Sequence, residues 1–394
     1  RAAYRWGANT APGLPCAPMK VGIGILGAGI VGGTLAAKLI EEADAIEAKS
    51  GLVLDVVKVG VRNLGKERPF DLPADRLTDN PEEVVDHPDV QLVVELMGGL
   101  EPAGSLVERA LKAGKPVVTA NKELVAARGL ELNDLAHDQG VALLYEAAVG
   151  GGIPIIRPLS QSLAGEKLTR VLGIVNGTTN FILTKMSEEG AAYEDVLAEA
   201  QALGYAEADP TADVGGGDAA SKAAILASLA FGAWIPGDEV PRTGIDGIAV
   251  EDLLRADDLG YAVKLLAIAE EYDDGIAVRV KPTLVPHDHP LASVRGAQNA
   301  IFVEGPAIGE LLFSGPGAGG DPSATAVLGD VIDAARELLA GAQVTPPVRF
   351  QPSKTLSDGH IATRRYYRLL VKDAPGVLAA IAEVFGQHGV SIAS

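Results

Sequence analysis

The chain has 394 residues, more than one hydrophobic core usually organises, so two or three domains are expected. Apolar residues make up 47% of it and charged residues 22%, which excludes a chain that is disordered over most of its length. The formal net charge of −19 repels phosphate backbones and anionic lipid surfaces. Neither nucleic acid nor a membrane is therefore an expected partner.

The single cysteine, Cys16, cannot form an internal disulfide, which favours a reducing cytoplasm. No segment has the length of a membrane span, since the best candidate, residues 223–234, is soon followed by Pro236 and Gly237. Residues 1–18 contain three prolines and lack the apolar core of a signal peptide, so we interpret them as a loose leader. Whether the chain naturally starts at Met19 stays open. We expect a soluble, cytoplasmic protein.

Residues 21–26 form a short apolar run of the strand type, and a glycine-rich turn and a helical apolar pattern follow at once. In such a turn the first glycine permits the tight bend, the second lets a pyrophosphate approach the backbone, and the third lets helix and strand pack closely. The N–H groups that open the helix then face the phosphates. The arrangement predicts a dinucleotide-binding (Rossmann) domain, with cofactor contacts from Gly27, Gly29, Ile30, Val31 and Gly32.

Strands expected at residues 52–61, 90–96, 116–120 and 141–146 alternate with helices at 81–85, 105–113 and 122–139. This alternation predicts a doubly wound α/β domain over residues 19–146. Ligands of such sheets bind beyond the carboxyl ends of the strands. We therefore expect Glu95 and the loop after it to line the nicotinamide side, and we assign cofactor contacts to Met97, Gly98, Thr119, Asn121 and Lys122.

Cofactor preference is expected at the end of the second strand, where NAD enzymes present an acid to the ribose. Arg62 and Lys66 stand there instead, and such cations can pair with a 2′-phosphate, which favours NADP over NAD. The alternative is a solvated basic loop. Asp55 is discounted because it falls inside the strand.

Residues 147–320 are expected to form a second, α+β domain, with strands at 168–175, 276–284 and 299–304 and helices at 193–202 and 219–231. A helix at 324–339 follows, and we expect residues 321–342 to pack back on the first domain. Residues 343–363, rich in Pro, Ser and Thr, are interpreted as a linker. The remainder, 364–394, predicts a strand at 366–371, a helix at 377–388 and a strand at 389–392, a unit too small to bury its own apolar face.

Asp218 and Lys222 lie four residues apart on a predicted helix, so both project from one face, directly after three glycines that clear space for a ligand. A carboxylate and an ammonium placed in this way can share one small polar substrate. The alternative is an ordinary surface ion pair, which contributes little to stability. The acidic residues Glu207, Asp209 and Asp213 just upstream favour the site.

At this point the sequence resembles the homoserine dehydrogenase family, over about residues 19–330. The glycine turn contributes to the resemblance, together with the segments 119–125, 146–154, 176–180 and 204–211. The most specific segment is Asp213-Val-Gly-Gly-Gly-Asp218, followed by Lys222.

The resemblance implies NAD(P)-dependent interconversion of L-homoserine and L-aspartate 4-semialdehyde, in the biosynthesis of threonine, methionine and isoleucine. It implies that Lys122 and Lys222 bracket the reacting oxygen, with Lys222 as the main acid/base residue and Asp218 orienting it. The substrate would be held by Glu207, Asp213, Tyr205, Gly177 and Thr178.

The resemblance also implies a monovalent-cation site for Na or K, made by the main-chain oxygens of Glu146, Val149, Gly151 and Ile153. It implies a homodimer or homotetramer, with the second domain's sheet at the dimer interface. Residues 366–394 resemble the start of an ACT domain, which in complete form implies feedback inhibition by threonine. Two alternatives stay open: another amino-acid dehydrogenase on the same fold, and a non-enzymatic sensor of dinucleotide and amino acid.

Overall fold

The computed structural model describes residues 19–68, 71–341, 349–351, 353–357, 359 and 361–392. The chain divides into two units, one up to Asp358 and one from Gly359 onward. The expected leader, with Cys16, and residues 343–348 of the expected linker lie outside the described residues. Among the described residues, no helix is both long and apolar enough to cross a bilayer.

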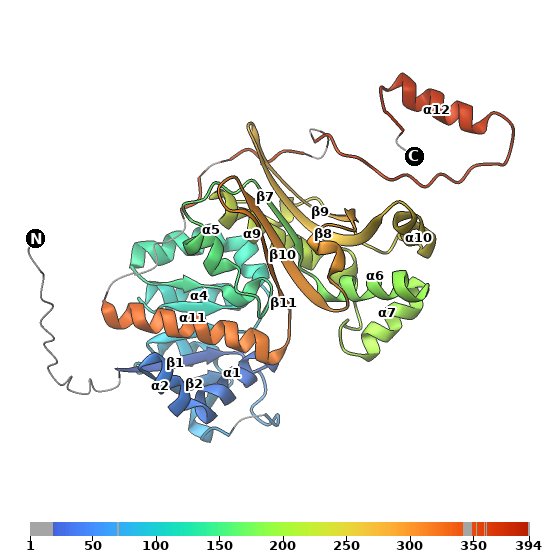
Figure 1. The fold of residues 1–394 in the computed structure, drawn as a ribbon. Helices are drawn as coiled ribbons and strands as arrows, with labels where there is room; N and C mark the ends of the chain where they lie inside the picture. Colours follow the sequence, from blue (N-terminus) through green and yellow to red (C-terminus); the bar gives the residue numbers. More distant parts are fainter. Residues whose placement is uncertain are drawn as a thin grey trace, which may run out of the picture. The chain divides into compact units, whose positions relative to one another are not determined.

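The first sheet has six parallel strands in the order β3-β2-β1-β4-β5-β6, which confirms the predicted doubly wound fold (Figure 1). Strands β4 and β5 are short and buried at every residue, as strands covered on both faces must be. The six strands are β1 (Met19–Leu26), β2 (Leu52–Gly60), β3 (Leu77–Thr78), β4 (Leu92–Glu95), β5 (Val117–Thr119) and β6 (Leu143–Leu144).

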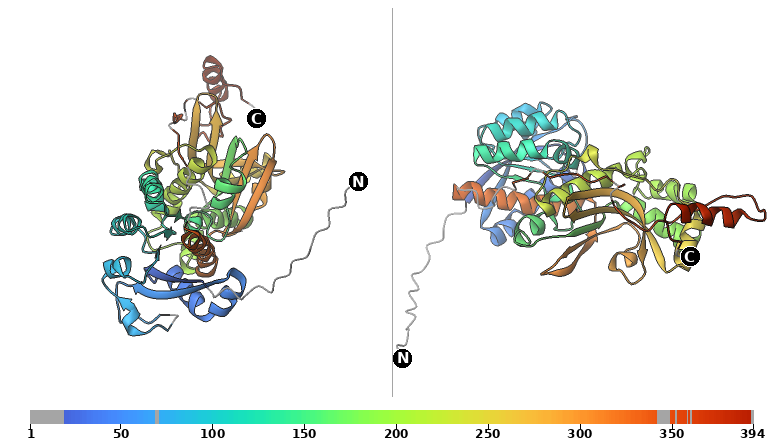
Figure 2. Two further views of the ribbon diagram at one scale, coloured as in Figure 1. Left: turned by 90° about the vertical axis from the view of Figure 1, so that its left-hand side faces the viewer. Right: turned by 90° about the horizontal axis from the view of Figure 1, so that it is seen from above.

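The helices around this sheet include one from the far end of the first unit. The segment α11 (Gly320–Ala340) packs against α1, β4 and β5, because Ala324, Val327 and Val331 form a buried apolar stripe at helical spacing (Figures 1 and 2). The others are α1 (Ile30–Glu41), α2 (Ala43–Ser50), α3 (Pro81–Asp86), α4 (Ala103–Lys112) and α5 (Lys122–Gln139).

The second sheet is antiparallel, with five strands in the order β11-β10-β7-β8-β9. The strands are β7 (Arg170–Ile174), β8 (Tyr261–Tyr272), β9 (Gly275–Pro286), β10 (Gln298–Gly305) and β11 (Gly309–Pro316). The sequence pattern predicts β7, β9 and β10 but gives no strand at β8 or β11. The run of β8 is rich in Ala, Leu and Glu, residues that favour helices, and only pairing with β7 and β9 makes it a strand.

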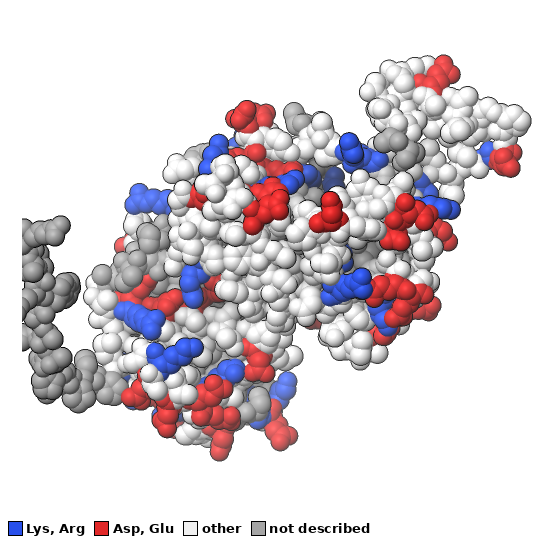
Figure 3. Space-filling model, viewed as in Figure 1, with Lys and Arg blue, Asp and Glu red and all other residues white. Residues whose placement is uncertain are grey.

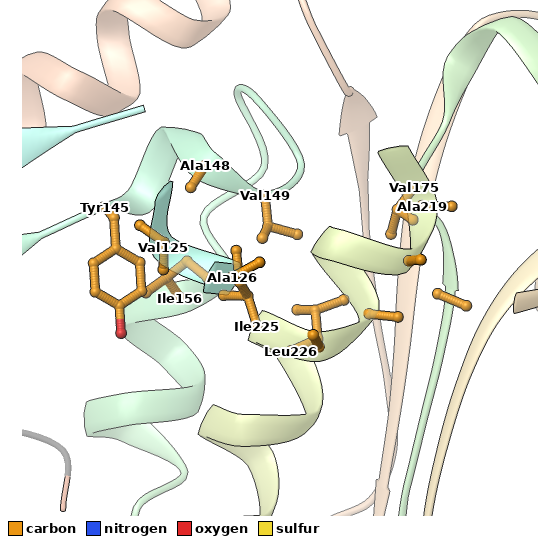
Figure 4. Packing of buried hydrophobic residues seen from close by; sticks show 14 of the residues in the cluster. Val125, Ala126, Tyr145, Ala148, Val149, Ile156, Val175, Ala219, Ile225 and Leu226 are labelled. Carbon is orange, nitrogen blue, oxygen red and sulfur yellow. The ribbon is translucent and has the colours of Figure 1, made fainter. Parts of the chain in front are cut away.

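The helices of the second part are α6 (Gly177–Glu189), α7 (Tyr193–Ala202), α8 (Thr211–Val214), α9 (Gly217–Phe231) and α10 (Val250–Asp258). The helices α5 and α9 pack side by side and join the two parts into one core. Figure 4 shows Ile225 and Leu226 of α9 close to Val125 and Ala126 of α5. Short turns of 3-10 or π type complete this unit: η1 (Ala74–Arg76), η2 (Glu146–Ala148), η3 (Pro158–Ser162), η4 (Gly237–Glu239) and η5 (Pro290–Ser293).

The secondary structure predicted for the tail, residues 364–394, is only partly right. Its helix forms as α12 (Val377–Gln387), but the strands predicted at 366–371 and 389–392 do not form among the described residues. A strand needs a neighbour to accept its backbone hydrogen bonds, and the described residues of the second unit contain no sheet that these segments could join. The described part of the expected linker also differs from a free linker, since Gln351 and Thr355 form isolated β-bridges with Ala233 and Ile276.

Candidate active site

The glycine turn between β1 and α1 has the close contacts that only glycine allows. Gly27 has φ +95°, and a Cβ on Gly32 would lie 2.0 Å from the carbonyl oxygen of Gly27. In contrast, a Cβ on Gly29 would meet no atom within 4 Å. Among the described residues, no side chain caps the N-terminus of α1 and the first turn of this helix holds no acid, so no side chain there competes with a ligand for the first N–H groups. Ile30 is 80% exposed there.

Glu95, at the carboxyl end of β4, organises the loop next to this turn. Its fully buried carboxylate accepts hydrogen bonds from the backbone N–H groups of Met97 (2.7 Å) and Gly98 (3.2 Å) and from the Thr119 hydroxyl (2.6 Å). Asn121 caps α5 and donates to the carbonyl of Gly99 (2.7 Å). Glu95 therefore positions the loop from the inside and does not reach a ligand directly.

Lys122 and Lys222 meet at one carboxylate. Lys122 opens α5, and its Nζ lies 3.2 Å from Oδ1 of Asp218; the Nζ of Lys222 lies 2.7 Å from Oδ2 of the same residue. Lys222 also donates to the carbonyl oxygen of Val175 (2.7 Å). The side chains of Asp218 and Lys222 are only 11% and 12% exposed, whereas Lys122 is 34% exposed. An ordinary surface ion pair does not fit this burial.

The cluster extends to a second carboxylate through Asn176, which sequence analysis did not single out as a site residue. The side-chain N–H groups of Asn176 donate to Asp213 (2.8 Å) and Asp218 (3.0 Å). Burial opposes ionisation of Asp218, but the two lysines outweigh it and lower the pKa of Asp218 to about 2. Burial raises the pKa of Asp213, and the Asp218 charge adds to the shift. The two acids thus have opposite pKa shifts.

The residues expected to bind the substrate differ in their contacts and in their exposure. The Thr178 hydroxyl donates to the carbonyl oxygen of Tyr205, a residue that is 47% exposed and whose ring lies tilted against that of Phe181, with centroids 5.0 Å apart. Gly177 opens α6 next to Asn176, where a Cβ would lie 2.7 Å from the Ala297 carbonyl oxygen. Glu207 is exposed, and among the described residues no side-chain hydrogen bond or ion pair joins it to the lysines.

Comparisons with known proteins assign the family. The profile described as the homoserine dehydrogenase NAD binding domain matches residues 27–146, and the homoserine dehydrogenase profile matches residues 154–332. The homoserine dehydrogenase of Mycobacterium leprae is 48% identical, covering 95% of this chain and 85% of its own length. That of Synechocystis is 45% identical, covering 95% and 89%. The chain belongs to the homoserine dehydrogenase family.

Solved structures also support the assignment of the chain to this family of oxidoreductases. A homoserine dehydrogenase from Thiobacillus denitrificans has a TM-score of 0.86 at 41% identity, covering 95% of this chain and 88% of that one. A hyperthermophilic archaeal homoserine dehydrogenase in complex with NADPH has a TM-score of 0.68 at 31% identity, covering 84% and 100%. Membership of the homoserine dehydrogenase family favours this activity over the two alternatives that the sequence left open.

In this member of the homoserine dehydrogenase family, the segment after β6 is organised by Glu146. Its buried carboxylate accepts from the backbone N–H groups of Ile155 (2.6 Å), Ile156 (2.8 Å) and Arg157 (2.9 Å). The Glu146 side chain is therefore committed to the backbone. Gly150 and Gly151 adopt φ +74° and +56° between Val149 and Ile153, the turn whose carbonyl oxygens were predicted to hold a cation.

The basic residues predicted to determine the preference for NADP over NAD follow β2 in the chain. The N–H of Gly27 donates to the carbonyl of Gly60 (2.9 Å), so the carboxyl end of β2 lies beside the glycine turn, with exposed Arg62 two residues further on. Arg68 braces the loop by donating to the backbone carbonyls of Leu64 and Lys66. Asp55 lies inside β2, and its carboxylate pairs with Arg76 (2.9 Å) and Lys20 (3.0 Å). It is therefore unsuited to a ribose contact.

Proposed function

We propose that this enzyme interconverts L-homoserine and L-aspartate 4-semialdehyde, with Lys222 as the acid/base residue. The observation that carries the proposal is the convergence of Lys122 and Lys222 on Asp218 from two separate helices. The Glu95-organised loop and the open glycine turn support nucleotide binding by Gly27, Gly29, Ile30, Val31 and Gly32, and by Met97, Gly98, Thr119, Asn121 and Lys122. A bound nicotinamide would accept or return the hydride.

The ionised Asp218 orients the Lys222 amine, and the Val175 carbonyl fixes a second direction of that amine. In homoserine oxidation Lys222 takes the hydroxyl proton, and in the reverse direction it returns that proton to the alkoxide oxygen that forms as the carbonyl carbon accepts the hydride. Lys122 provides a second positive charge on the more exposed side. We assign the substrate ammonium and carboxylate to Glu207, Asp213 and Tyr205 and to the start of α6 at Gly177 and Thr178.

The decisive experiment compares Lys222→Ala with Lys112→Ala. Lys112 forms an ion pair of the same i,i+4 spacing with Glu108, but on α4. Nicotinamide absorbance measures turnover with homoserine, and nucleotide titration measures binding. We expect Lys222→Ala to lose at least about a hundredfold in kcat with nucleotide binding intact, because general acid/base groups contribute that much. Turnover of aspartate but not homoserine, or an active Lys222→Ala, would overturn the proposal.

We further propose a preference for NADP over NAD. Its support is that Arg62 and Lys66 follow the strand end beside the glycine turn, while the acid within β2, Asp55, is already paired. Arg62→Ala is expected to lower the ratio of kcat/KM with NADPH to that with NADH, whereas Lys49→Ala, on α2, leaves it unchanged. A ratio that stays constant in Arg62→Ala would remove Arg62 from the proposal.

A monovalent cation is proposed at the main-chain oxygens of Glu146, Val149, Gly151 and Ile153. Support comes from the tight turn at Gly150 and Gly151 and from the commitment of the Glu146 carboxylate to other N–H groups, which leaves only main-chain oxygens as donors. Turnover in Na⁺ or K⁺ should exceed turnover in tetramethylammonium at equal ionic strength. Equal rates would count against the site.

We propose a homodimer, or a homotetramer built from it, that uses the second sheet. Figure 3 shows a broad area without charged side chains over the middle of the visible face, where β10 and β11 run, and Leu312 on the edge strand β11 is 43% exposed. Light scattering of the wild type and of Leu312→Asp tests this. We also propose that the enzyme acts in the cytoplasm, in the synthesis of threonine, methionine and isoleucine. Where the ACT domain is complete, we propose that threonine inhibits the enzyme through it.

A further inference from the structure

The two helices that bring the site together both begin at the site and end far from it. Lys122 opens α5, an 18-residue helix about 27 Å long, and Asp218 lies in the first turn of α9, a 15-residue helix about 22 Å long. Their C-terminal ends lie away from the lysine cluster. Whatever holds those ends also sets how the two N-terminal ends meet.

A segment that follows α11 in the sequence contacts both of these distal ends. We call residues 349–351 and 353–356 the strap. The N–H of Gln351 donates to the carbonyl oxygen of Gly232 (2.7 Å), the residue that ends α9. Arg349 donates to the imidazole of His137 (3.3 Å), in the last turn of α5.

Phe350 adds an apolar contact to Trp234, a residue just beyond the end of α9 that itself touches α5. Its ring packs edge-on against Trp234 with centroids 5.5 Å apart, three residues after the end of α9. The indole of Trp234 in turn lies directly on the α5 backbone, because a Cβ on Gly129 would be only 2.8 Å from its Cη2 atom. Trp234 therefore packs between Phe350 and α5 and links the two.

The rest of the strap is anchored on the second sheet. The N–H of Ile276 donates to Lys354 (2.9 Å), and the N–H of Leu356 donates back to Ile276 (2.8 Å). Leu356 is 5% exposed, and Gly275 has no room for a side chain, since its Cβ would lie 2.3 Å from the Lys354 carbonyl. The strap is thus held at both ends by β-type pairing.

We propose that the strap is a positioning element for the active site, with Phe350 as its main positioning residue. By tying the C-terminal ends of α5 and α9 together, it sets the relative placement at which Lys122 reaches the Asp218 carboxylate that also holds Lys222. Misplacement of about 1 Å is enough to cost a large part of catalysis. The expected effect of the strap on turnover rests on the proposed function. Its expected effect on the ends of α5 and α9 does not depend on that function.

The test compares Phe350→Ala with Phe385→Ala, which removes another aromatic contact, the Tyr367–Phe385 pair of the C-terminal unit. We expect Phe350→Ala to lower kcat about tenfold, with KM for the nucleotide within about twofold and Phe350→Tyr restoring kcat. Phe385→Ala should leave both unchanged. Gln351→Pro, which removes the N–H donated to Gly232, should reproduce the loss if Phe350→Ala proves unstable.

Hydrogen exchange of the free protein supplies a measurement independent of activity. Phe350→Ala should speed amide exchange in the first turns of α5 and α9, far from the altered residue, relative to Phe385→Ala. Wild-type turnover of homoserine tests the proposed function by itself. The strap proposal is overturned if exchange at those turns is unchanged, or if Phe350→Ala and Gln351→Pro lower the melting temperature yet keep wild-type kcat.

Discussion

The backbone N–H of Glu146 donates a hydrogen bond of 2.7 Å to the carboxylate of Asp330, 184 residues further along the chain. Arg157 donates to the other oxygen of Asp330 (2.7 Å). Because Glu146 begins the connection to the second domain and Asp330 lies on α11, this bond fixes the start of that connection against the helix that packs on the first sheet.

Asp330 should make stability depend on pH. Burial raises the pKa of Asp330 to about 7, the Glu146 carboxylate adds to the shift, and the hydrogen bonds from the Glu146 N–H and Arg157 partly offset it. The unfolded carboxyl titrates near its ordinary pKa of about 3.9. Between these values the folded protein binds more protons, so its stability falls as pH rises from about 4 to about 7.

We therefore expect the melting temperature of the wild type, relative to Asp330→Asn, to fall between pH 5 and pH 8. The variant cannot ionise at this position, so the difference between the two curves isolates Asp330 from the other acids. Thermal unfolding at several pH values measures it. A difference that rises with pH would show that the Arg157 ion pair outweighs burial.

Asn176 should matter as the bridge between two carboxylates. Asn176→Ala leaves Asp213 and Asp218 without a shared donor and removes the cap of α6, so we expect a stability loss of about 1–3 kcal/mol and a higher KM for homoserine. Asn176→Asp keeps an acceptor for the cap but adds a third acid. If the bridge matters for catalysis, Asn176→Asp should lose more kcat than stability; equal losses of both would assign Asn176 to folding alone.

Glu95 should act on the nucleotide through the loop that it holds. Glu95→Ala leaves two partly buried N–H groups and the buried Thr119 hydroxyl without their acceptor, and a buried group left unsatisfied costs about 1–3 kcal/mol. We expect KM for the nucleotide to rise at least about tenfold, with a milder effect in Glu95→Gln, which keeps one acceptor oxygen. An unchanged nucleotide KM in Glu95→Ala would separate this loop from the cofactor.

Lys122 and Asp218 should act as one unit. Lys122→Met and Asp218→Asn are each expected to lower kcat, and the double variant should be little worse than Asp218→Asn, because removing the carboxylate charge already releases both lysines. Steady-state kinetics of the four proteins closes this cycle. Fully additive losses would mean that Lys122 works independently of Asp218.

Much of the first domain follows from local sequence. The run before Gly27, the glycine turn and the alternating strands and helices depend on periodicity and on backbone freedom, which neighbouring residues determine. The i,i+4 placement of Asp218 and Lys222 is local in the same sense. The family resemblance could also be recognised from short motifs.

Only the tertiary structure decided the rest, because it depends on contacts between residues distant in sequence. Strand β8 exists because β7 and β9 flank it, while the segments of the tail predicted as strands have no such neighbour among the described residues of their unit. Asn176 could be predicted as a helix cap before Gly177, but its second role requires Asp213 and Asp218, about 40 residues away, to fold against it. The meeting of Lys122 with Asp218 is likewise set by how α5 packs on α9, which no local pattern encodes.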